Sequence, residues 1–191
     1  MIHANNVGWK KSLLERMRMP RFNPARAIRW IGDVDDKNLK RAMKKLNELL
    51  KDEKKAEIFL MIQSEGGDMS TGFAFYDYVN SVLKQPLTTI ALGEVASMGI
   101  TLFLAGKRRI VTPSSHFFLH PGEFKPKGRL EDVGGMTNAV KRMDKRYDEI
   151  IHVASKGKIS LKKANKLSRK VTVVTPEEAI ELGLAHEMWT P

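Results

Sequence analysis

The feature that most constrains the fold is an unbroken apolar run, Ile58-Phe59-Leu60-Met61-Ile62, set between two segments of helical periodicity. Such a run is typical of a strand that is buried on both faces of a parallel sheet. Residues 36–51 before it place apolar side chains three and four positions apart, which predicts an amphipathic helix. Residues 70–83 after it repeat that spacing. A buried strand between two such helices indicates an α/β fold with a largely parallel sheet.

The rest of the chain continues this alternation. Further strands are predicted at residues 28–31, 87–92, 109–112, 116–119 and 171–174, with a last one reaching Trp189. Helices are predicted at residues 97–105, 130–154 and 160–169, and after the capping box Thr175-Pro176-Glu177-Glu178. The helix over 130–154 carries an apolar stripe along its whole length. Such a stripe predicts a partner surface, either the domain body or another subunit.

The first 26 residues differ from the remainder, because they lack a clear apolar period and contain two prolines. We interpret residues 1–26 as a basic N-terminal extension and residues 27–191 as one folded domain. Residues 1–30 hold seven basic side chains and one acidic one, which is over half of the net charge of +11. A basic arm attracts nucleic acid, anionic membranes or acidic partners. No RNA-binding aromatic motif accompanies it, so we favour a solvated terminus over nucleic-acid binding.

The composition excludes several classes of protein. The chain has no cysteine, which excludes disulfides, thiolate metal sites and a cysteine nucleophile. No apolar run approaches the roughly 18 residues of a membrane span. Charges occupy the first 20 residues, where a signal peptide needs an apolar segment. We therefore expect a cytoplasmic protein, and the absence of metal-ligand spacing or a phosphate loop predicts no cofactor.

Two segments place a glycine pair or a reactive side chain after a predicted strand. Gly66-Gly67 follows the first buried strand and is able to present backbone N–H groups as an oxyanion hole, although a plain strand-to-helix turn is the simpler explanation of the pair alone. Ser97 precedes a buried helix, where N–H groups favour developing negative charge. That setting suits a serine nucleophile with the Met98 N–H as a second oxyanion donor. The alternative is a serine that only caps the helix.

His120 ends another apolar strand, 23 residues after Ser97. A histidine in this place is able to accept the serine proton as general base. A purely structural histidine is the alternative. Each of these signals is weak alone, so their order and surroundings carry the interpretation.

Together the segments resemble the proteolytic subunit of Clp proteases from Ala27 to Trp189. The resemblance is carried by Gly66-Gly67 after the buried strand, by Ser97-Met98-Gly99, by Leu119-His120-Pro121 and by the helix over 175–183. It implies an α/β, crotonase-like fold of repeated β-β-α units with a protruding long helix. It also implies stacked heptameric rings that interlock through the helix over 130–154, and an AAA+ ATPase that feeds in unfolded chains.

The resemblance further implies a serine endopeptidase that hydrolyses peptide bonds of unfolded proteins or peptides. Ser97 would form the acyl-enzyme, His120 would be the general base, and the Gly67 and Met98 N–H groups would form the oxyanion hole. No metal or other cofactor is implied.

The sequence departs from this family at the third residue of the triad. A gapless match places Val171 where the family has an aspartate. The candidates for orienting His120 in place of that aspartate are Glu131, Asp132, Thr172 and a backbone carbonyl. The segment before Ala27 also differs from the one that docks the ATPase in the family.

Two alternative functions therefore remain open. One is a weakly active or inactive structural subunit of a mixed ring. The other is a crotonase-type acyl-CoA enzyme, whose chemistry needs the same pair of backbone donors.

Overall fold

The computed structural model describes residues 22–51, 56–83, 86–122 and 130–189, and only the backbone of residues 130–133. Its sheet contains parallel strands in the order β1-β2-β3-β4-β7. They are β1 (Ala27–Ile31), β2 (Ile58–Ser64), β3 (Leu87–Ala96), β4 (Arg108–Val111) and β7 (Glu187–Met188). β5 (His116–Leu119) pairs in parallel with the second half of β3, and β6 (Thr172–Val174) pairs antiparallel with β5. The α/β class predicted from the sequence is confirmed.

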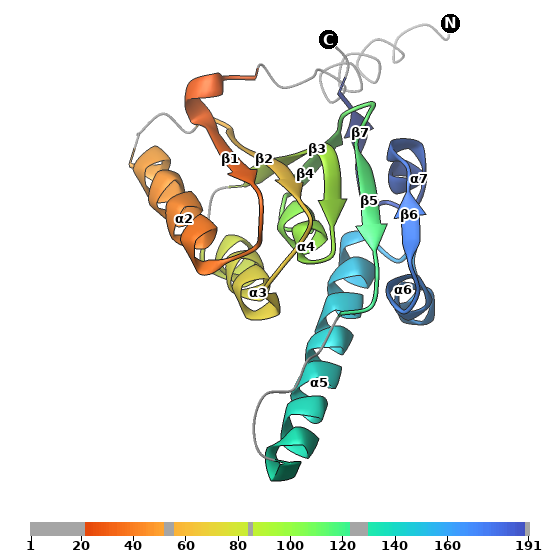
Figure 1. Cartoon of the computed structure of the whole chain (residues 1–191). Coiled ribbons are helices and arrows are strands. Elements are labelled where there is room, and N and C mark those ends of the chain that lie inside the picture. The colour runs from red at the N-terminus through yellow and green to blue at the C-terminus, as the bar shows by residue number, and fades with distance from the viewer. Residues whose placement is uncertain (1–21, 52–55, 84–85, 123–129, 190–191) are drawn as a thin grey trace, which may run out of the picture.

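Helices connect these strands near the predicted positions (Figure 1). They are α2 (Asp36–Leu50), α3 (Met69–Asp77), α4 (Met98–Leu104), α5 (Leu130–Ala154), α6 (Leu161–Ser168) and α7 (Pro176–Glu181), with the short turns η1 (Pro24–Arg26) and η2 (Tyr78–Val82). The capping box at the start of α7 forms as predicted, with Thr175 and Glu178 bonding to each other's backbone. α4 is buried along its whole length, as its apolar sequence predicts.

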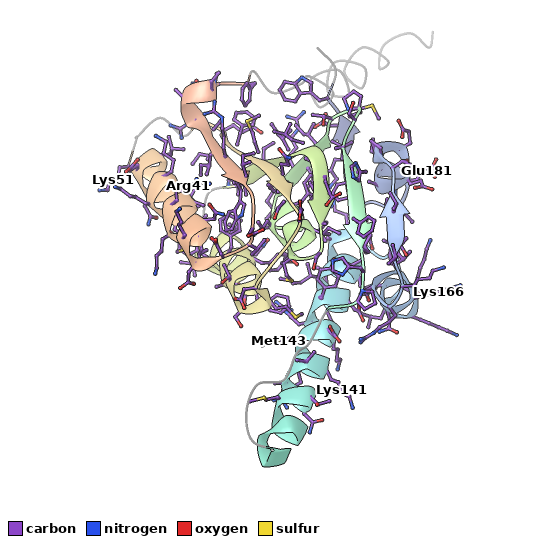
Figure 2. The ribbon with its side chains drawn as sticks, viewed as in Figure 1. Arg41, Lys51, Lys141, Met143, Lys166 and Glu181 are labelled. Atoms are coloured by element: carbon purple, nitrogen blue, oxygen red, sulfur yellow. The ribbon has the colours of Figure 1, made fainter. Side chains whose placement is uncertain are left out.

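The long helix α5 extends beyond the rest of the domain (Figure 1). Its C-terminal half buries Tyr147, Ile150 and Ile151 in the main core. Its first half carries Met136 and Met143, which are only partly buried. Figure 2 shows Met143 on this projecting part. The apolar stripe therefore packs on the domain body at one end and is only partly buried toward its other end.

Apolar side chains cover both faces of the sheet. Along β2, Ile58 and Leu60 belong to the main core, which also contains residues of α2, α3 and α4. Phe59 points to the opposite face and forms a smaller cluster with Ile90 and Ile110. Because successive side chains of a strand alternate between faces, a strand buried on both sides needs an unbroken apolar run.

β3 is longer than the sequence predicts. The prediction ended this strand at residue 92, before Gly93, but the strand continues to Ala96. Gly93 has a φ of +54°, which lets the chain bend there without ending the strand. Before the bend β3 pairs with β4, and after it β3 pairs with β5. One strand thereby serves two partners, and its end is brought beside the end of β5.

The last residues of the predicted N-terminal extension pack on the domain. The Phe22 ring lies edge-on to Phe59 at 5.2 Å and to Trp189 at 5.7 Å. Arg26 is buried and donates to the Glu57 carbonyl at 3.2 Å. The first 21 residues, with most of the basic arm, lie outside the described part of the chain. The domain boundary at residue 27 therefore stays a prediction.

Among the helices that the structure describes, none has the length and apolar character needed to cross a membrane.

Candidate active site

Ser97 occupies the turn between β3 and α4 with an unusual backbone conformation. Its φ of +48° and ψ of −122° lie where non-glycine residues are rarely found. Such conformations cost about 1–3 kcal/mol and persist only where the surroundings fix them. The Ser97 N–H donates to the Phe118 carbonyl at 2.9 Å, which ties the turn to β5. The hydroxyl makes no capping bond to α4, so the alternative of a capping serine is not supported.

The glycine pair brings the end of β2 against this turn. Gly66 and Gly67 have φ values of +106° and +143°. A Cβ on Gly66 would lie 2.6 Å from the Ser97 Cβ, and one on Gly67 would lie 2.5 Å from the Val34 carbonyl oxygen. Only glycine fits both positions. The pair is therefore a close approach of backbones next to Ser97, which a plain turn does not require.

Two backbone N–H groups beside Ser97 are available to a ligand. Gly67 and Met98 line the same cavity as Ser97. Within the described part of the chain, neither N–H donates a hydrogen bond to another residue. Met98 is the first residue of α4, where N–H groups lack an intrahelical acceptor. A pair of preorganised N–H donors is the arrangement that stabilises an oxyanion.

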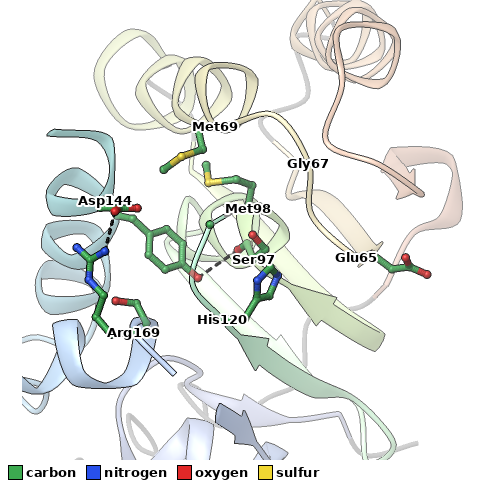
Figure 3. Close-up of a pocket in the computed structure, with 11 residues that line it drawn as sticks. Glu65, Gly67, Met69, Ser97, Met98, His120, Asp144 and Arg169 are labelled. Atoms are coloured by element: carbon green, nitrogen blue, oxygen red, sulfur yellow. Dashed lines mark hydrogen bonds and ion pairs between the residues drawn. The ribbon is translucent and has the colours of Figure 1, made fainter. Parts of the chain in front are cut away.

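His120 follows β5 directly and lies beside Ser97 (Figure 3). The two residues meet because Ala96 of β3 pairs with Phe118 of β5. The imidazole Nδ1 lies 2.8 Å from the Pro121 carbonyl oxygen. Since a carbonyl oxygen only accepts, Nδ1 carries the hydrogen and Nε2 is left as an acceptor. A general base that faces a serine hydroxyl needs this tautomer.

A cavity of about 310 Å³ opens next to these groups. Met69, Met98 and Tyr147 line it together with charged side chains. Arg169 Nη1 lies 2.7 Å from Asp144 Oδ2 on the side that α5 and α6 form. The Glu65 carboxylate points away from the other labelled groups (Figure 3). Among the described residues, no three histidine, aspartate or glutamate side chains group as metal ligands.

Comparison with known proteins identifies the family. A model of the Clp protease family matches residues 15–191. The ATP-dependent Clp protease proteolytic subunit 1 of Leifsonia xyli subsp. xyli (strain CTCB07) is 30% identical over 186 residues, which cover 96% of this chain and 90% of that protein. The chain belongs to the Clp protease family. The resemblance inferred from the motifs is confirmed, and with it the class of a Clp-type serine peptidase. Neither comparison favours a crotonase-type acyl-CoA enzyme.

Against the Clp protease pattern, the strand register places a valine opposite His120. The antiparallel register pairs Leu119 with Thr172, so the next pair outward is His120 with Val171. Opposed residues of an antiparallel pair project to the same face. Val171 is apolar and 64% exposed. It neither accepts a hydrogen bond from the imidazole nor stabilises its charged form.

One of the orienting groups expected from the sequence is present in the structure. The Pro121 carbonyl contacts His120, as described above. The Thr172 hydroxyl instead lies 3.1 Å from the Leu167 carbonyl oxygen of α6 and 3.2 Å from the Lys170 carbonyl oxygen. The side chains of Glu131 and Asp132 lie outside the described part of the chain. Of the candidates that the structure describes, the backbone carbonyl is therefore the group that contacts the His120 imidazole.

The sequence analysis missed a contact made by Tyr147. Its hydroxyl donates to the Ser97 carbonyl oxygen at 3.2 Å. Tyr147 belongs to the apolar stripe of the long helix, which indicates burial and gives no sign of a hydrogen bond to the nucleophile turn. The ion pair between Asp144 and Arg169 also had no sequence signal, because its members lie 25 residues apart.

Proposed function

We propose that this chain hydrolyses peptide bonds through an acyl-enzyme on Ser97, with His120 as general base and the Gly67 and Met98 N–H groups as oxyanion hole. The observation that supports the proposal is the meeting of these four residues at one cavity. They come from three separate places in the sequence, since Ser97 and Met98 are adjacent. The glycine conformations and the strained serine have a functional explanation in this arrangement.

In the acylation step the Ser97 hydroxyl attacks the carbonyl carbon of the scissile peptide bond while His120 Nε2 takes its proton. The carbonyl oxygen becomes an oxyanion, and the Gly67 and Met98 N–H groups donate to it. The carbon–nitrogen bond then breaks, and the leaving amine receives the proton from His120. An ester on Ser97 and a free amine are the products of this step.

Deacylation reverses the roles. A water molecule attacks the ester while His120 takes one of its protons, and the same backbone donors hold the second oxyanion. The Ser97 oxygen leaves and recovers the proton from His120. The peptide is released as a carboxylic acid, and the enzyme returns to its starting state.

We expect the reaction to be slower than that of a complete triad. Replacing the triad aspartate lowers kcat by about 10⁴ in a well-studied serine protease, chiefly because the histidine takes the wrong tautomer. Here the Pro121 carbonyl, 2.8 Å from His120 Nδ1, favours the required tautomer. Among the described residues, no carboxylate bonds to His120 to stabilise the imidazolium that forms during the reaction.

Membership of the Clp protease family implies an oligomeric ring and association with Clp ATPases. We infer stacked heptameric rings joined through the projecting half of α5, where Met136 and Met143 are only partly buried. Unfolded proteins delivered by an AAA+ ATPase would be the substrates, together with short peptides. The crotonase-like fold and the cytoplasmic location are inferred from the same family.

A second candidate is a weakly active or inactive structural subunit of a mixed ring. Val171 favours it, because a partner subunit with a complete triad would supply most of the activity. The Ser97 conformation and the His120 tautomer favour the first proposal, since an inactive subunit has no need for either.

A fluorophosphonate probe distinguishes the two candidates, since it labels only an activated serine. Wild type and Ser81→Ala, which removes an exposed hydroxyl on η2, should be labelled at Ser97. Ser97→Ala should not be labelled, and His120→Gln should be labelled more slowly. An assembled wild-type ring that takes up no label would sink the proposed mechanism and support the structural subunit.

A further inference from the structure

The Ser97 carbonyl oxygen accepts two hydrogen bonds. One comes from the Ile100 N–H at 3.0 Å, within the start of α4. The other comes from the Tyr147 hydroxyl at 3.2 Å, which reaches across from α5 (Figure 3). The second bond connects two segments that are 50 residues apart in the sequence.

Tyr147 is built to donate this bond. Its side chain is 7% exposed and packs in the main core. Burial raises the pKa of the Tyr147 phenol, so the hydroxyl keeps its hydrogen at any physiological pH. The ring has little freedom to move, so the hydroxyl is a fixed donor.

Hydrogen bonds and an ion pair hold the turn of α5 that carries Tyr147 against α6. The buried Asp148 carboxylate accepts from Ser168 Oγ at 2.6 Å and from Asn165 Nδ2 at 2.8 Å. One turn earlier, Asp144 pairs with Arg169 at 2.7 Å. These contacts fix the rotation of α5 about its axis at this point. They therefore fix where the Tyr147 hydroxyl lies.

The Ser97 carbonyl and the Met98 N–H belong to the same planar peptide unit. A group that fixes the carbonyl oxygen therefore fixes the direction of that N–H. Hydrogen bonds along such a chain also polarise one another, so a bond to the carbonyl makes the N–H a better donor. The Met98 N–H is a proposed oxyanion donor, and it sits next to the strained Ser97 backbone.

We infer that Tyr147 is a positioning residue: through the Ser97 carbonyl it orients the Met98 N–H toward the oxyanion. This inference rests on the proposed function, in which that N–H stabilises the tetrahedral intermediate. The oxyanion exists only during the reaction, so loss of the Tyr147 hydroxyl acts on kcat and not on substrate binding.

The kinetic test compares Tyr147→Phe with wild type on a short fluorogenic peptide. Loss of one neutral hydrogen bond should lower kcat by roughly threefold to tenfold and leave KM within about twofold. Tyr78→Phe is the matched control, because its hydroxyl donates to Asn47 Oδ1 at 2.7 Å on the exposed side of the domain. Tyr78→Phe should have the same kcat and KM as wild type. A loss confined to KM, or an equal loss in the control, would overturn the inference.

A spectroscopic test does not depend on activity. Ser97-Met98 is the sole serine–methionine pair in the sequence. Labelling serine carbonyls with ¹³C and methionine amides with ¹⁵N therefore gives one ¹³C–¹⁵N correlation, observable by solid-state NMR on sedimented protein. The signal should move in Tyr147→Phe and stay in place in Tyr78→Phe. An unchanged signal in Tyr147→Phe would refute the positioning role. If wild type is inactive but the signal shifts in Tyr147→Phe, the proposed function is refuted while the hydrogen bond from Tyr147 to the Ser97 carbonyl is confirmed.

Discussion

Replacing Val171 by aspartate would restore a carboxylate opposite His120. Residue 171 lies one pair beyond the end of the β5–β6 register and projects to the same face as His120. Its side chain is 64% exposed, so an aspartate there would be hydrated and would not disturb the core. We predict that Val171→Asp raises kcat, because the carboxylate stabilises the imidazolium formed when His120 takes the Ser97 proton.

The size of the effect follows from the position. Opposed residues in an antiparallel pair have Cα atoms about 4.5–5.5 Å apart, which brings a carboxylate to within about 4 Å of the imidazole. Two unit charges at that distance interact by about 1 kcal/mol in water and about 4 kcal/mol near a protein surface. Exposure of residue 171 favours the lower half of this range. A gain of about 1–2.5 kcal/mol corresponds to a rise in kcat of roughly fivefold to seventyfold.

The assay is cleavage of a fluorogenic peptide by assembled protein, with two controls. Val171→Asn matches the shape of aspartate without its charge. Val173→Asp places the same charge two residues further along β6, at another exposed valine. The reasoning is refuted if Val171→Asp is no faster than Val171→Asn, or if Val173→Asp is accelerated as much.

Four further predictions concern stability and the oxyanion hole. Gly67→Ala should abolish peptide cleavage and lower the urea midpoint of unfolding, since its Cβ would lie 2.5 Å from a backbone oxygen. Gly134→Ala has open space around its Cβ and should raise the free energy of unfolding by about 0.5–1 kcal/mol. Arg109→Met should lower the free energy of unfolding by about 2–4 kcal/mol, because the buried guanidinium donates to four backbone carbonyls. A loss below about 1 kcal/mol would contradict this role of Arg109. Burial and the nearby Arg109 hold the pKa of His186 at about 4, against 6.5 when unfolded. As the pH falls, His186 therefore takes up a proton in the unfolded chain before it does in the folded protein. The free energy of unfolding should be at its maximum above about pH 6.5 and fall toward pH 4. His186→Gln should reduce this pH dependence.

The order of helices and strands could be predicted because their signals are local. The helix over 130–154 begins and ends where its periodicity predicts. The extent of β3 could not be predicted, because Gly93 ends a strand in one context and bends it in another. Which of the two occurs depends on β4 and β5, which pair with β3 from distant parts of the sequence.

The candidate site was predictable where side-chain chemistry marks it. Ser97 and His120 stand out as reactive residues at strand ends, and the structure brings them together. A backbone carbonyl was among the candidates for orienting His120, but its identity, that of Pro121, and the contact of Tyr147 were not predictable. The first acts through a backbone carbonyl, which every residue has, and the second through a hydroxyl on an apolar stripe. Both depend on distances between elements that sequence spacing does not determine.

The central claim is tested most directly by peptidase activity of wild type and Ser97→Ala, measured side by side after the oligomer has been sized. We predict that assembled wild type cleaves a short fluorogenic peptide and that Ser97→Ala, in the same assembly, does not. Equal activity of the two proteins, or silence of both in an intact ring, would contradict the proposed role of Ser97.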